Sequence, residues 1–526
     1  MSELHSTAQV PSNQDTKLTP IKQVDAALKA CTFGYFHIKL LMIAFVGNIA
    51  GVFISTSTGY LLPVAECDLQ MTLLRKGVLN AMPYTGMLFS SIVSGLLTGA
   101  IGRKFFLVFG FSGVFVFNLV AASSQTFEVL VTAKFFEGLL FGAAFSSFMA
   151  LTAEFCCNNV RDRVILFQTS FTVIAQIVIA LLSWAILTND WRVSFFDGKF
   201  VLNTWNFYLY AMSLFPLAAC IMYAAFVPES PKYLVTQKKY DEAREILIKI
   251  YVQNTRKPAN TYPFLDIWKN ISESASDEDP ENQVKDSFKH QVVVGLLNIK
   301  PMFRKPLLTY LCLICTTNFI IMCMYNVFRL WFPQLSAIVE NYHAEDNQEF
   351  CSMLDAYTAN LKLLRNTTQN EVCVPTKSGD ETYINSIIVG CVSLVPFLIT
   401  GILVNKVGKK RLLMAAGFVC VATTMSIRWA NGKIIMVSLF SITIALARVM
   451  LSLNQTLTIE TFGTTTRTLA ISFMMVTGRI GTLTGNVSFP VLLDMGCEVP
   501  FFTISALLVC FIVLSLFIPN KKQIKK

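Results

Sequence analysis

Charged residues are scarce in this sequence. Asp, Glu, Lys and Arg make up 14% of its 526 residues, whereas apolar residues make up 54%. A soluble globular domain carries about 25% charged residues. The low charge, the mean hydropathy of +0.54 and the 43 Phe against six Trp indicate helices that face lipid. The composition therefore predicts an integral membrane protein in a lipid bilayer.

The sequence also lacks the residue groups that most enzymes use. It has four His, and no nucleophile–base pair, metal-ligand cluster or phosphate-binding loop stands out. Cys312 and Cys315 have C-x-x-C spacing, but within an apolar stretch they are expected to be packing residues. No basic patch with interleaved aromatic residues is present, which argues against nucleic-acid binding. We predict no enzyme, no cofactor and no metal.

The positive charge has a location that suits a membrane protein. The formal net charge is +10, and most Lys and Arg fall in segments that we place on one side, as the positive-inside rule requires of cytoplasmic segments. The first 38 residues are polar and contain no signal-peptide core. Both termini are therefore expected in the cytoplasm, with the plasma membrane or a secretory-type vesicle as the location.

Apolar stretches long enough to cross a bilayer, about 20 residues each, occur twelve times in the sequence. They are residues 39–62, 78–100, 104–124, 128–151, 165–188, 206–227, 306–333, 384–405, 411–429, 433–458, 468–490 and 499–519. We predict an all-α membrane protein with twelve transmembrane helices in two six-helix bundles. Its parts are a tail at 1–38, a bundle at 39–227, a cytoplasmic linker at 228–305, a bundle at 306–519 and a basic tail at 520–526.

A repeated motif relates the two bundles. Gly95, Gly99 and Gly102 are followed by Arg103 and Lys104, and a similar glycine-cation run begins 306 positions later. The second copy comprises Gly401, Gly408, Lys409, Lys410 and Arg411. Such long-range similarity indicates internal duplication.

Two acid–base pairs repeat with the same offset. Glu154 precedes Arg161 by seven positions, as Glu460 precedes Arg467. A carboxylate at a helix end beside Arg on a neighbouring helix can form a charge-assisted clamp. We expect these clusters to gate the cytoplasmic side, because they are duplicated at a fixed offset; positive-inside charges without that role are the alternative. The predicted gating residues are Arg103, Lys104, Glu154, Arg161, Lys409, Arg411, Glu460 and Arg467.

These motifs together resemble the major facilitator superfamily. The segment 95–104 is similar to its G-x-x-x-D-x-x-G-R-K signature, and 228–234 (PESPKYL) to a motif of its sugar and organic-ion branches. Residues 459–467 resemble the organic ion transporters, whereas 62–68 and 478–481 look closer to synaptic vesicle glycoprotein 2. The resemblance implies the major facilitator fold and secondary transport of a small organic solute by alternating access.

The sequence departs from this family at one acidic position. Gly99 and Asn405 stand where the family carries a carboxylate. We expect Arg103 and Arg411 to pair instead with Glu154 and Glu460, or with helix C-termini. The loss also motivates an alternative function, a transport-incompetent vesicle or surface protein whose 334–383 loop binds a partner of unknown identity.

Four cations fall within the predicted spans, where an unpaired charge is costly and suggests function. Arg479 resembles a helix-11 Arg through which organic anion transporters hold carboxylates, so an organic anion is the favoured substrate. The alternative is a structural cation that binds backbone carbonyls or pairs with Glu137 across the bundle. Lys134 can pair with Glu137 three positions on. Arg448 lies inside its span, and Arg329 is expected to snorkel to the outer interface.

Polar and aromatic residues in the expected cavity helices are candidates for solute binding, although they could instead satisfy one another. With Arg479 and Glu137, they are Asn48, Tyr325, Phe328, Asn454 and Gln455. Residues 39–62 contain no Asp or Glu, which leaves Glu137 as the deep titratable acid. Facilitated diffusion or exchange is thus favoured over proton symport.

Two long polar segments complete the prediction. In the linker, 240–251 has helical spacing with one apolar face. The loop at 334–383, expected on the non-cytoplasmic side, carries a glycosylation sequon at Asn366 between Cys351 and Cys373. In an oxidising compartment these two cysteines could form a disulfide, and two free thiols are the alternative.

Overall fold

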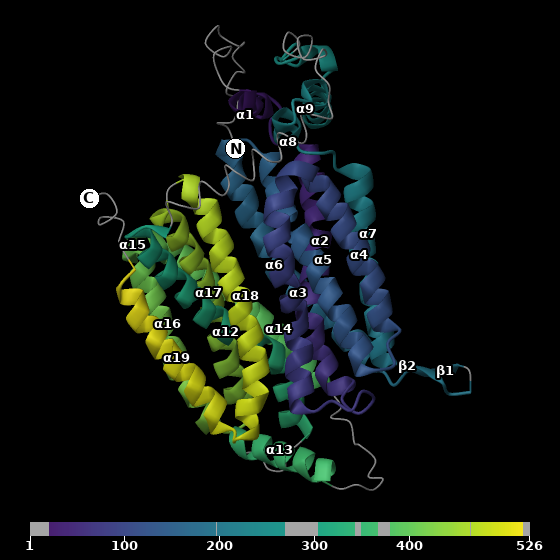
Figure 1. Cartoon of the computed structure of the whole chain (residues 1–526), viewed down its shortest axis with the longest axis vertical. Coiled ribbons are helices and arrows are strands. Elements are labelled where there is room, and N and C mark those ends of the chain that lie inside the picture. Colours follow the sequence, from purple (N-terminus) through teal and green to yellow (C-terminus); the bar gives the residue numbers. More distant parts are fainter. Residues whose placement is uncertain are drawn as a thin grey trace.

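The fold consists almost entirely of long helices in two groups that lie side by side (Figure 1). The computed structural model describes residues 20–195, 197–268, 303–341, 349–366, 379–462 and 464–518. The first group comprises α2 (Tyr35–Val64), α3 (Leu73–Ile101), α4 (Arg103–Ala122), α5 (Phe127–Glu154), α6 (Asn158–Leu187) and α7 (Thr204–Phe226). The second comprises α12 (Leu307–Asn341), α14 (Asp380–Val392), α15 (Leu394–Val407), α16 (Lys409–Ser426), α17 (Lys433–Thr461), α18 (Thr464–Asp494) and α19 (Glu498–Leu516).

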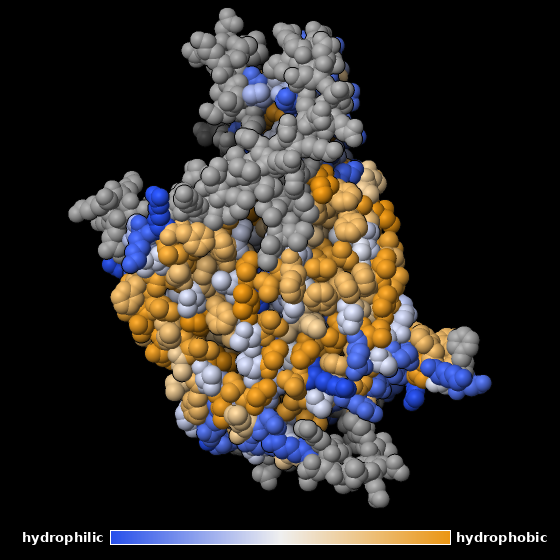
Figure 2. Space-filling view, in the orientation of Figure 1, coloured by the Kyte–Doolittle hydropathy of each residue, from blue (hydrophilic) through white to orange (hydrophobic). Residues whose placement is uncertain are grey.

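Membrane spans are found at the predicted places. Ten spans of the described chain are long and apolar enough to cross a membrane. The remaining two long helices, α3 with 29 residues and α18 with 31, coincide with the predicted spans 78–100 and 468–490. Figure 2 shows an apolar belt across the visible face of the helices, with polar residues towards its two ends. The prediction of an all-α membrane protein is confirmed.

One predicted span, 384–405, is divided into two helices. The helical bonding is interrupted at Ser393, between α14 and α15. Pro396 in the first turn of α15 has no N–H to donate to the carbonyl four residues earlier. The hydrogen-bond ladder therefore has a gap at this point, and the two helices follow one another as a broken span.

Short helices cover one end of the bundles, which we call the α9 end (Figure 1). They are α1 (Pro20–Ala30), α8 (Pro231–Thr236) and α9 (Tyr240–Thr255). Ala243, Leu247 and Ile250 on the predicted apolar face of α9 are buried. The 1–38 segment, predicted as a separate tail, contributes α1 to this cluster: its Val24 and Ala27 are fully buried.

The opposite end, the α13 end, carries a helix and a hairpin (Figure 1). The 334–383 segment begins inside α12 and contains α13 (Phe350–Asn366). A two-stranded antiparallel hairpin, β1 (Arg192–Phe195) and β2 (Phe200–Asn203), connects α6 to α7. The sequon that starts at Asn366 continues beyond the described residues, so glycosylation there stays a prediction.

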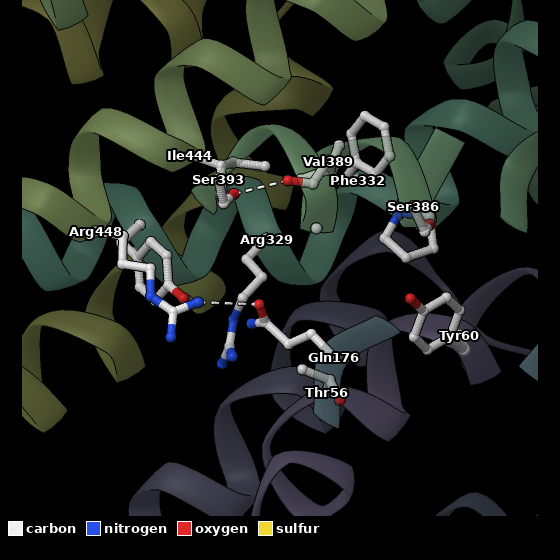
Figure 3. A pocket seen from close by; sticks show the side chains of 13 residues that line it. Thr56, Tyr60, Gln176, Arg329, Phe332, Ser386, Val389, Ser393, Ile444 and Arg448 are labelled. Carbon is white, nitrogen blue, oxygen red and sulfur yellow. Dashed lines mark hydrogen bonds between the residues drawn. The ribbon is translucent and has the colours of Figure 1, made fainter. Parts of the chain in front are cut away.

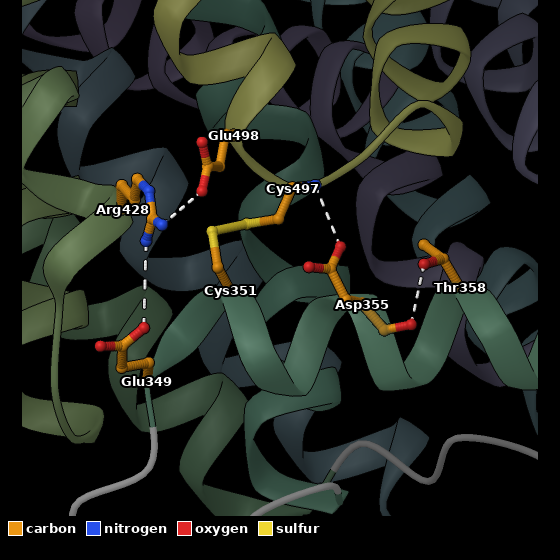
Figure 4. The surroundings of a disulfide bond; sticks show 7 residues. All are labelled: Glu349, Cys351, Asp355, Thr358, Arg428, Cys497 and Glu498. Atoms are coloured by element: carbon orange, nitrogen blue, oxygen red, sulfur yellow. Dashed lines mark hydrogen bonds and ion pairs between the residues drawn. A yellow bond between two sulfur atoms is a disulfide. The ribbon is translucent and has the colours of Figure 1, made fainter.

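The predicted disulfide partner of Cys351 was wrong. Cys351 is bonded to Cys497, 146 positions away, just before α19 (Figure 4). Because α13 folds back across its own bundle, Cys351 lies near a residue remote in sequence. Cys67 is also disulfide-bonded, and Cys373 lies outside the described residues.

The duplicated motif has the same backbone geometry in both copies. Gly102 and Gly408 have φ of +109° and +94°, values that favour glycine. Each ends one helix and directly precedes the next, α4 or α16. A Cβ at Gly102 would also lie 2.6 Å from Glu229 Oε2. The glycines are therefore required for these sharp connections, which supports the internal repeat.

Among the described residues, three helix pairs make the most extensive contacts between the two groups. α2 packs on α12, α3 on α18, and α6 on α14. A Cβ added at Gly59 of α2 would lie 2.5 Å from the carbonyl oxygen of Leu330 in α12. The absence of a side chain thus permits close backbone approach between the two bundles on the side of the α13 end.

Candidate functional site

A cavity lies where helices of both bundles meet (Figure 3). Its walls come from α2 and α6 of the first bundle and from α12, α14 and α17 of the second. The space within it and at its mouth is about 580 Å³, open solvent included, and about 50 Å³ of this can hold the centre of a water molecule. Its polar lining includes Thr56, Tyr60, Gln176, Tyr325, Arg329 and Arg448.

Arg329 is fixed in this cavity by neutral partners from both bundles. Its guanidinium donates to the Ser55 carbonyl oxygen at 3.2 Å, to Asn326 Oδ1 at 3.0 Å and to the Tyr84 hydroxyl. It also lies 5.2 Å from the centre of the Tyr325 ring, a cation–π contact. Its Nε is buried and has no hydrogen-bond partner within the described part of the chain.

Arg448 provides a second cation from another helix. Its Nη1 donates to Gln176 Oε1 of α6 at 3.2 Å (Figure 3). Tyr325 connects the two cations, because its ring contacts Arg329 and it lies within electrostatic range of Arg448. The polar residues of the cavity therefore form one cluster that spans both bundles.

The cluster has an excess of positive charge. Among the described residues, no carboxylate lies within ion-pair distance of Arg329 or Arg448. A guanidinium inside a membrane protein is stabilised by a counter-ion or by several oxygen acceptors. The site has neutral acceptors but no described anion. Its chemistry thus suits a ligand with a carboxylate or a similar acidic group.

The predicted binding residues are distributed over several places. Tyr325 lines the cavity. Phe328 is instead buried in the second bundle, stacked with Phe501. Asn48 donates to the Gln168 carbonyl oxygen at 3.4 Å, and Asn454 Oδ1 accepts from Thr317 at 3.3 Å. Both asparagines thus bond within their own bundle, and the buried side-chain nitrogen of Asn454 has no hydrogen-bond partner in the described part of the chain.

Other predicted residues lie away from the cavity lining. Gln455 is exposed on α17. Lys134 Nζ lies 2.9 Å from Glu137 Oε2, and both side chains are fully buried. The predicted Lys134–Glu137 ion pair is therefore confirmed. The pair hydrogen-bonds α2 through Ser57 at 3.5 Å, so it holds helices of the first bundle together.

Arg479 contacts the backbone rather than the cavity. Its Nη1 donates to the carbonyl oxygen of Met87 in α3, and it is not among the residues that line the cavity. This is the carbonyl-binding role considered as the alternative. Arg329, expected to snorkel to the interface, lines the cavity because oxygen acceptors from α2, α3 and its own helix hold it there.

Polar networks link the two bundles between the cavity and the α13 end. Lys76, completely buried, donates to Tyr357 of α13 at 2.7 Å and pairs with Glu66 at 2.8 Å. Trp184 Nε1 donates to Asp380 Oδ1 at 2.7 Å. In addition, the rings of Tyr60 and Tyr383 stack with centres 6.2 Å apart. These contacts close the bundles together on this side of the cavity.

Ion pairs at the α9 end connect helices of the same bundle. Arg103 lies 3.1 Å from Glu154, as predicted. A further acid, Glu229, accepts the backbone N–H groups of Arg103 and Lys104 at 3.2 Å. A carboxylate at a helix N-terminus is favourable for the free N–H groups there. Glu229 thus supplies a negative charge near the position where the family acid is replaced by Gly99.

The second copy uses a different cation from the one predicted. Lys409 Nζ lies 2.7 Å from Glu460 Oε1, whereas Arg411 is exposed. Lys409 directly follows Gly408 as Arg103 follows Gly102, so the same chain geometry aims it at the equivalent acid. The predicted Arg411–Glu460 pair is therefore corrected to Lys409–Glu460.

The short helices contact the first of these clusters. Asp25 of α1 lies 3.8 Å from Arg161 and 3.9 Å from Lys232. Burial lowers the pKa of Lys232; Arg161 lowers it further, while Asp25 and Glu154 act in the opposite direction. The side chain of Arg467, the repeat equivalent of Arg161, lies outside the described residues.

Comparison with known proteins decides the family. Residues 32–328, more than half of the chain, match the family described as sugar (and other) transporters. The chain belongs to this family. It is also similar to human synaptic vesicle glycoprotein 2A, with 25% identity over 239 residues, and to mouse synaptic vesicle glycoprotein 2C, with 26%. These alignments cover 45% of this chain and 32% of each relative, so only about a third of those proteins is represented.

Solved transporters share the fold across nearly the whole chain. The inward-open xylose transporter XylE from E. coli has a TM-score of 0.64 at 14% identity, covering 92% of this chain and 97% of that one. The nucleoside transporter NupG has a TM-score of 0.56 at 9% identity, with coverages of 93% and 99%. The chain has the major facilitator fold and is related to the synaptic vesicle glycoprotein 2 branch, so the predicted fold and the predicted family resemblance are confirmed.

Gln176 was missed by the sequence analysis, and Arg329 and Arg448 were noted as cations within spans but not assigned to the binding site. Each lies in a predicted span, and Arg329 stands four positions after Tyr325, which places both on one face of α12. The available signal for a binding-site residue was a cation within a predicted span that has no acidic residue one helical turn away. The fold was needed to show that the two arginines share one cavity.

Proposed function

We propose that this protein moves a small organic anion across a membrane by alternating access. The cluster of Arg329 and Arg448, with Gln176 and Tyr325, carries the proposal because it offers two cations and no described carboxylate. The anionic group of the solute would supply the missing negative charge. The neutral and apolar lining, such as Phe332 and Ile444, would contact the organic part.

The α9 end is assigned to the cytoplasm. The positive-inside rule supports this orientation, because Arg103, Lys104, Lys409 and Lys410 all lie there, beside the linker and its basic residues. The disulfide at the α13 end agrees, since disulfides persist in oxidising compartments. The solute would then enter or leave the cytoplasm through the α9 end.

The pattern of contacts supports an inward-facing state. The Lys76, Trp184 and Tyr60 contacts join the bundles between the cavity and the α13 end. By contrast, the Arg103–Glu154 and Lys409–Glu460 pairs lie within one bundle each. In an outward-facing state the first set would separate. The predicted gating role of the second set is retained as a proposal, with Lys409 in place of Arg411.

The alternative of a protein that no longer transports has less support. It was motivated by the missing acids at Gly99 and Asn405. Glu154, Glu229 and Glu460 provide negative charge at the neighbouring cations, so the missing acids alone do not favour a failed gate. Partner binding by the 334–383 segment would also have to involve α13, which is attached to its own bundle by a disulfide.

A ligand screen on purified protein tests the proposal. We expect benzoate or succinate, as probes of the anion class, to raise the melting temperature, and tetraethylammonium and glucose to leave it unchanged. Arg448→Gln should weaken anion binding by roughly 10- to 100-fold, because a hydrogen bond to a charged group contributes about 1.5–3 kcal/mol. Arg75→Gln, at an exposed ion pair with Glu128, is the matched control. Equal stabilisation by anions and cations, unaffected by Arg448→Gln, would contradict the proposal.

A further inference from the structure

The hairpin between α6 and α7 is amphipathic. In its register Val193 pairs with Leu202 and Phe195 with Phe200, so these four apolar side chains share one face. The other face carries Arg192 opposite Asn203 and Ser194 opposite Val201. Strand residues usually turn an apolar face towards a core. This hairpin has such a face but extends away from the helices (Figure 1).

The β1 half of the apolar face is exposed, whereas β2, with Phe200 and Leu202, is half-buried. Val193 is 41% exposed and Phe195 46%, and all of β1 is exposed. Figure 2 shows apolar colour on the side of the hairpin nearer the apolar belt and polar colour on the opposite side. The apolar side of the hairpin therefore faces the level of the apolar belt.

The base of the hairpin is held firmly. Gln125 of the α4–α5 connection exchanges two hydrogen bonds of 3.0 Å with the backbone of Val201. Asn203 donates to Asp68 at 2.8 Å. Thr204 Oγ1 accepts from the Trp191 backbone at 2.9 Å. These bonds fix the orientation of the hairpin relative to the bundle, so the direction of its apolar face is built into the fold.

The position along the helices places the hairpin at the membrane boundary. β1 begins five residues after the end of α6 at Leu187, and α7 begins directly after β2. Leu181 of α6 and Leu214 of α7, on the membrane side of this level, are 45% and 62% exposed, as expected for lipid contact. Trp191, 48% exposed, lies against Phe207. Tryptophan is enriched at the membrane–water interface.

We propose that the 190–203 hairpin is a membrane anchor that lies on the leaflet at the α13 end. Its apolar face, formed by Val193, Phe195, Phe200 and Leu202, contacts the boundary between lipid head groups and acyl chains, and its polar face contacts water. The segment carries Arg192 and Lys199 against Asp190 and Asp197. Their charges balance, so apolar contact rather than charge drives the binding. The anchor is independent of the transported solute.

Collision-accessibility measurements on the full-length protein in lipid nanodiscs test this anchor. A spin label is attached through p-acetylphenylalanine, which leaves the native cysteines and the disulfide unchanged. Val193 on the apolar face is compared with Ser194, its neighbour on the polar face of the same exposed strand. Melting temperatures of both labelled proteins verify that they remain folded.

The anchor predicts opposite accessibilities at the two positions. At Val193, oxygen, which concentrates in the bilayer, should relax the label several-fold more effectively than the water-soluble nickel complex. At Ser194 the nickel complex should be the more effective reagent. The proposal is overturned if the nickel complex dominates at both positions, which indicates a hairpin in water. It is also overturned if Val193 is shielded from both reagents, which indicates a protein partner or a second copy.

Discussion

A guanidinium within a membrane protein needs either a counter-ion or a set of oxygen acceptors, and three arginines of this chain meet that need differently. Arg479 uses a backbone carbonyl of α3. Arg329 is surrounded by carbonyl, amide and hydroxyl oxygens. Arg448 has the amide oxygen of Gln176. The last two face a cavity, so they can receive an anion without losing a carboxylate partner.

This distinction predicts different effects of substituting Arg448 and Arg479. Arg479→Gln should lower the melting temperature by a few degrees, because the Met87 carbonyl loses its charged partner, but should change anion affinity by less than about threefold. Arg448→Gln should have the reverse pattern. Titration of benzoate or succinate, monitored by melting temperature, separates the two effects. Loss of anion binding in Arg479→Gln at unchanged stability would instead place Arg479 in the binding site.

Residue-level prediction was best where the deciding contact is local. Lys134 and Glu137 are three positions apart on one helix, and their pairing follows from helix geometry. Arg329 was misplaced because its acceptors belong to α2 and α3, remote in sequence. Lys409 and Arg411 are two positions apart and therefore face different directions on a helix. Lys409 could be recognised as the equivalent of Arg103 only because each directly follows a glycine.

Among the elements, α13 forms a cover that belongs to the second bundle. Besides the disulfide, Asp355 of α13 accepts the backbone N–H of Cys497 at 3.0 Å, and Lys362 pairs with Asp494 at 3.2 Å. Arg428 pairs with Glu498 at the same corner (Figure 4). Among the described residues, α13 contacts the first bundle through Tyr357, which hydrogen-bonds Lys76 and Glu66. We therefore expect α13 to move with the second bundle.

Removing the disulfide should lower stability substantially. The bond closes a chain segment of 146 residues, for which the chain-entropy model gives about 4–5 kcal/mol. Replacing both Cys351 and Cys497 by Ser should therefore lower the melting temperature of the purified protein. Cys312→Ser, at an exposed free cysteine, is the control. An unchanged melting temperature in the double variant would show that the other α13 contacts suffice.

The helices at the α9 end form a second unit. Asn254 of α9 joins it to the connection between α1 and α2. Its side-chain nitrogen donates to the carbonyl oxygens of Cys31 at 3.0 Å and Thr32 at 2.9 Å. Its side-chain oxygen accepts from the Phe36 backbone at 2.9 Å. Cys31 is buried beneath this turn, and burial raises the pKa of its thiol to about 12. The thiol is therefore both covered and neutral at physiological pH.

Removing the Asn254 hydrogen bonds should expose the Cys31 thiol. In the native protein at pH 7.5, alkylation of Cys31 by iodoacetamide should be at least tenfold slower than that of an unfolded cysteine, because the reactive species is the thiolate. Asn254→Ala should raise the rate several-fold, whereas Gln253→Ala on the same helix should not. Peptide mass spectrometry measures the modification at Cys31. Equal rates in both variants would show that α1 is held by other contacts.

Sequence periodicity predicted which segments form helices better than it predicted which other elements those helices contact. The apolar spans and the buried face of α9 follow from local patterns. α1 was not distinguished from a polar tail, since its burial depends on the partner surface of α8 and α9. The Cys351 partner was equally out of reach, because pairing depends on the distance between α13 and α19 in the fold.

For the whole molecule, the duplicated halves and their uneven contacts fit a transporter that alternates between two openings. The 306-position offset is matched by equal backbone geometry at Gly102 and Gly408 and by equivalent ion pairs. The repeat was therefore readable from the sequence. Which side is closed depends on contacts such as Lys76–Tyr357, which sequence spacing does not encode.

Counterflow by purified protein in liposomes tests the central claim most directly. Liposomes are loaded with an unlabelled anion identified in the ligand screen, and entry of the labelled anion is followed. We predict transient accumulation by the wild-type protein and by Arg75→Gln, and at least tenfold less by Arg448→Gln. A labelled organic cation should not accumulate. Absence of counterflow for every anion that stabilises the wild-type protein would contradict the account.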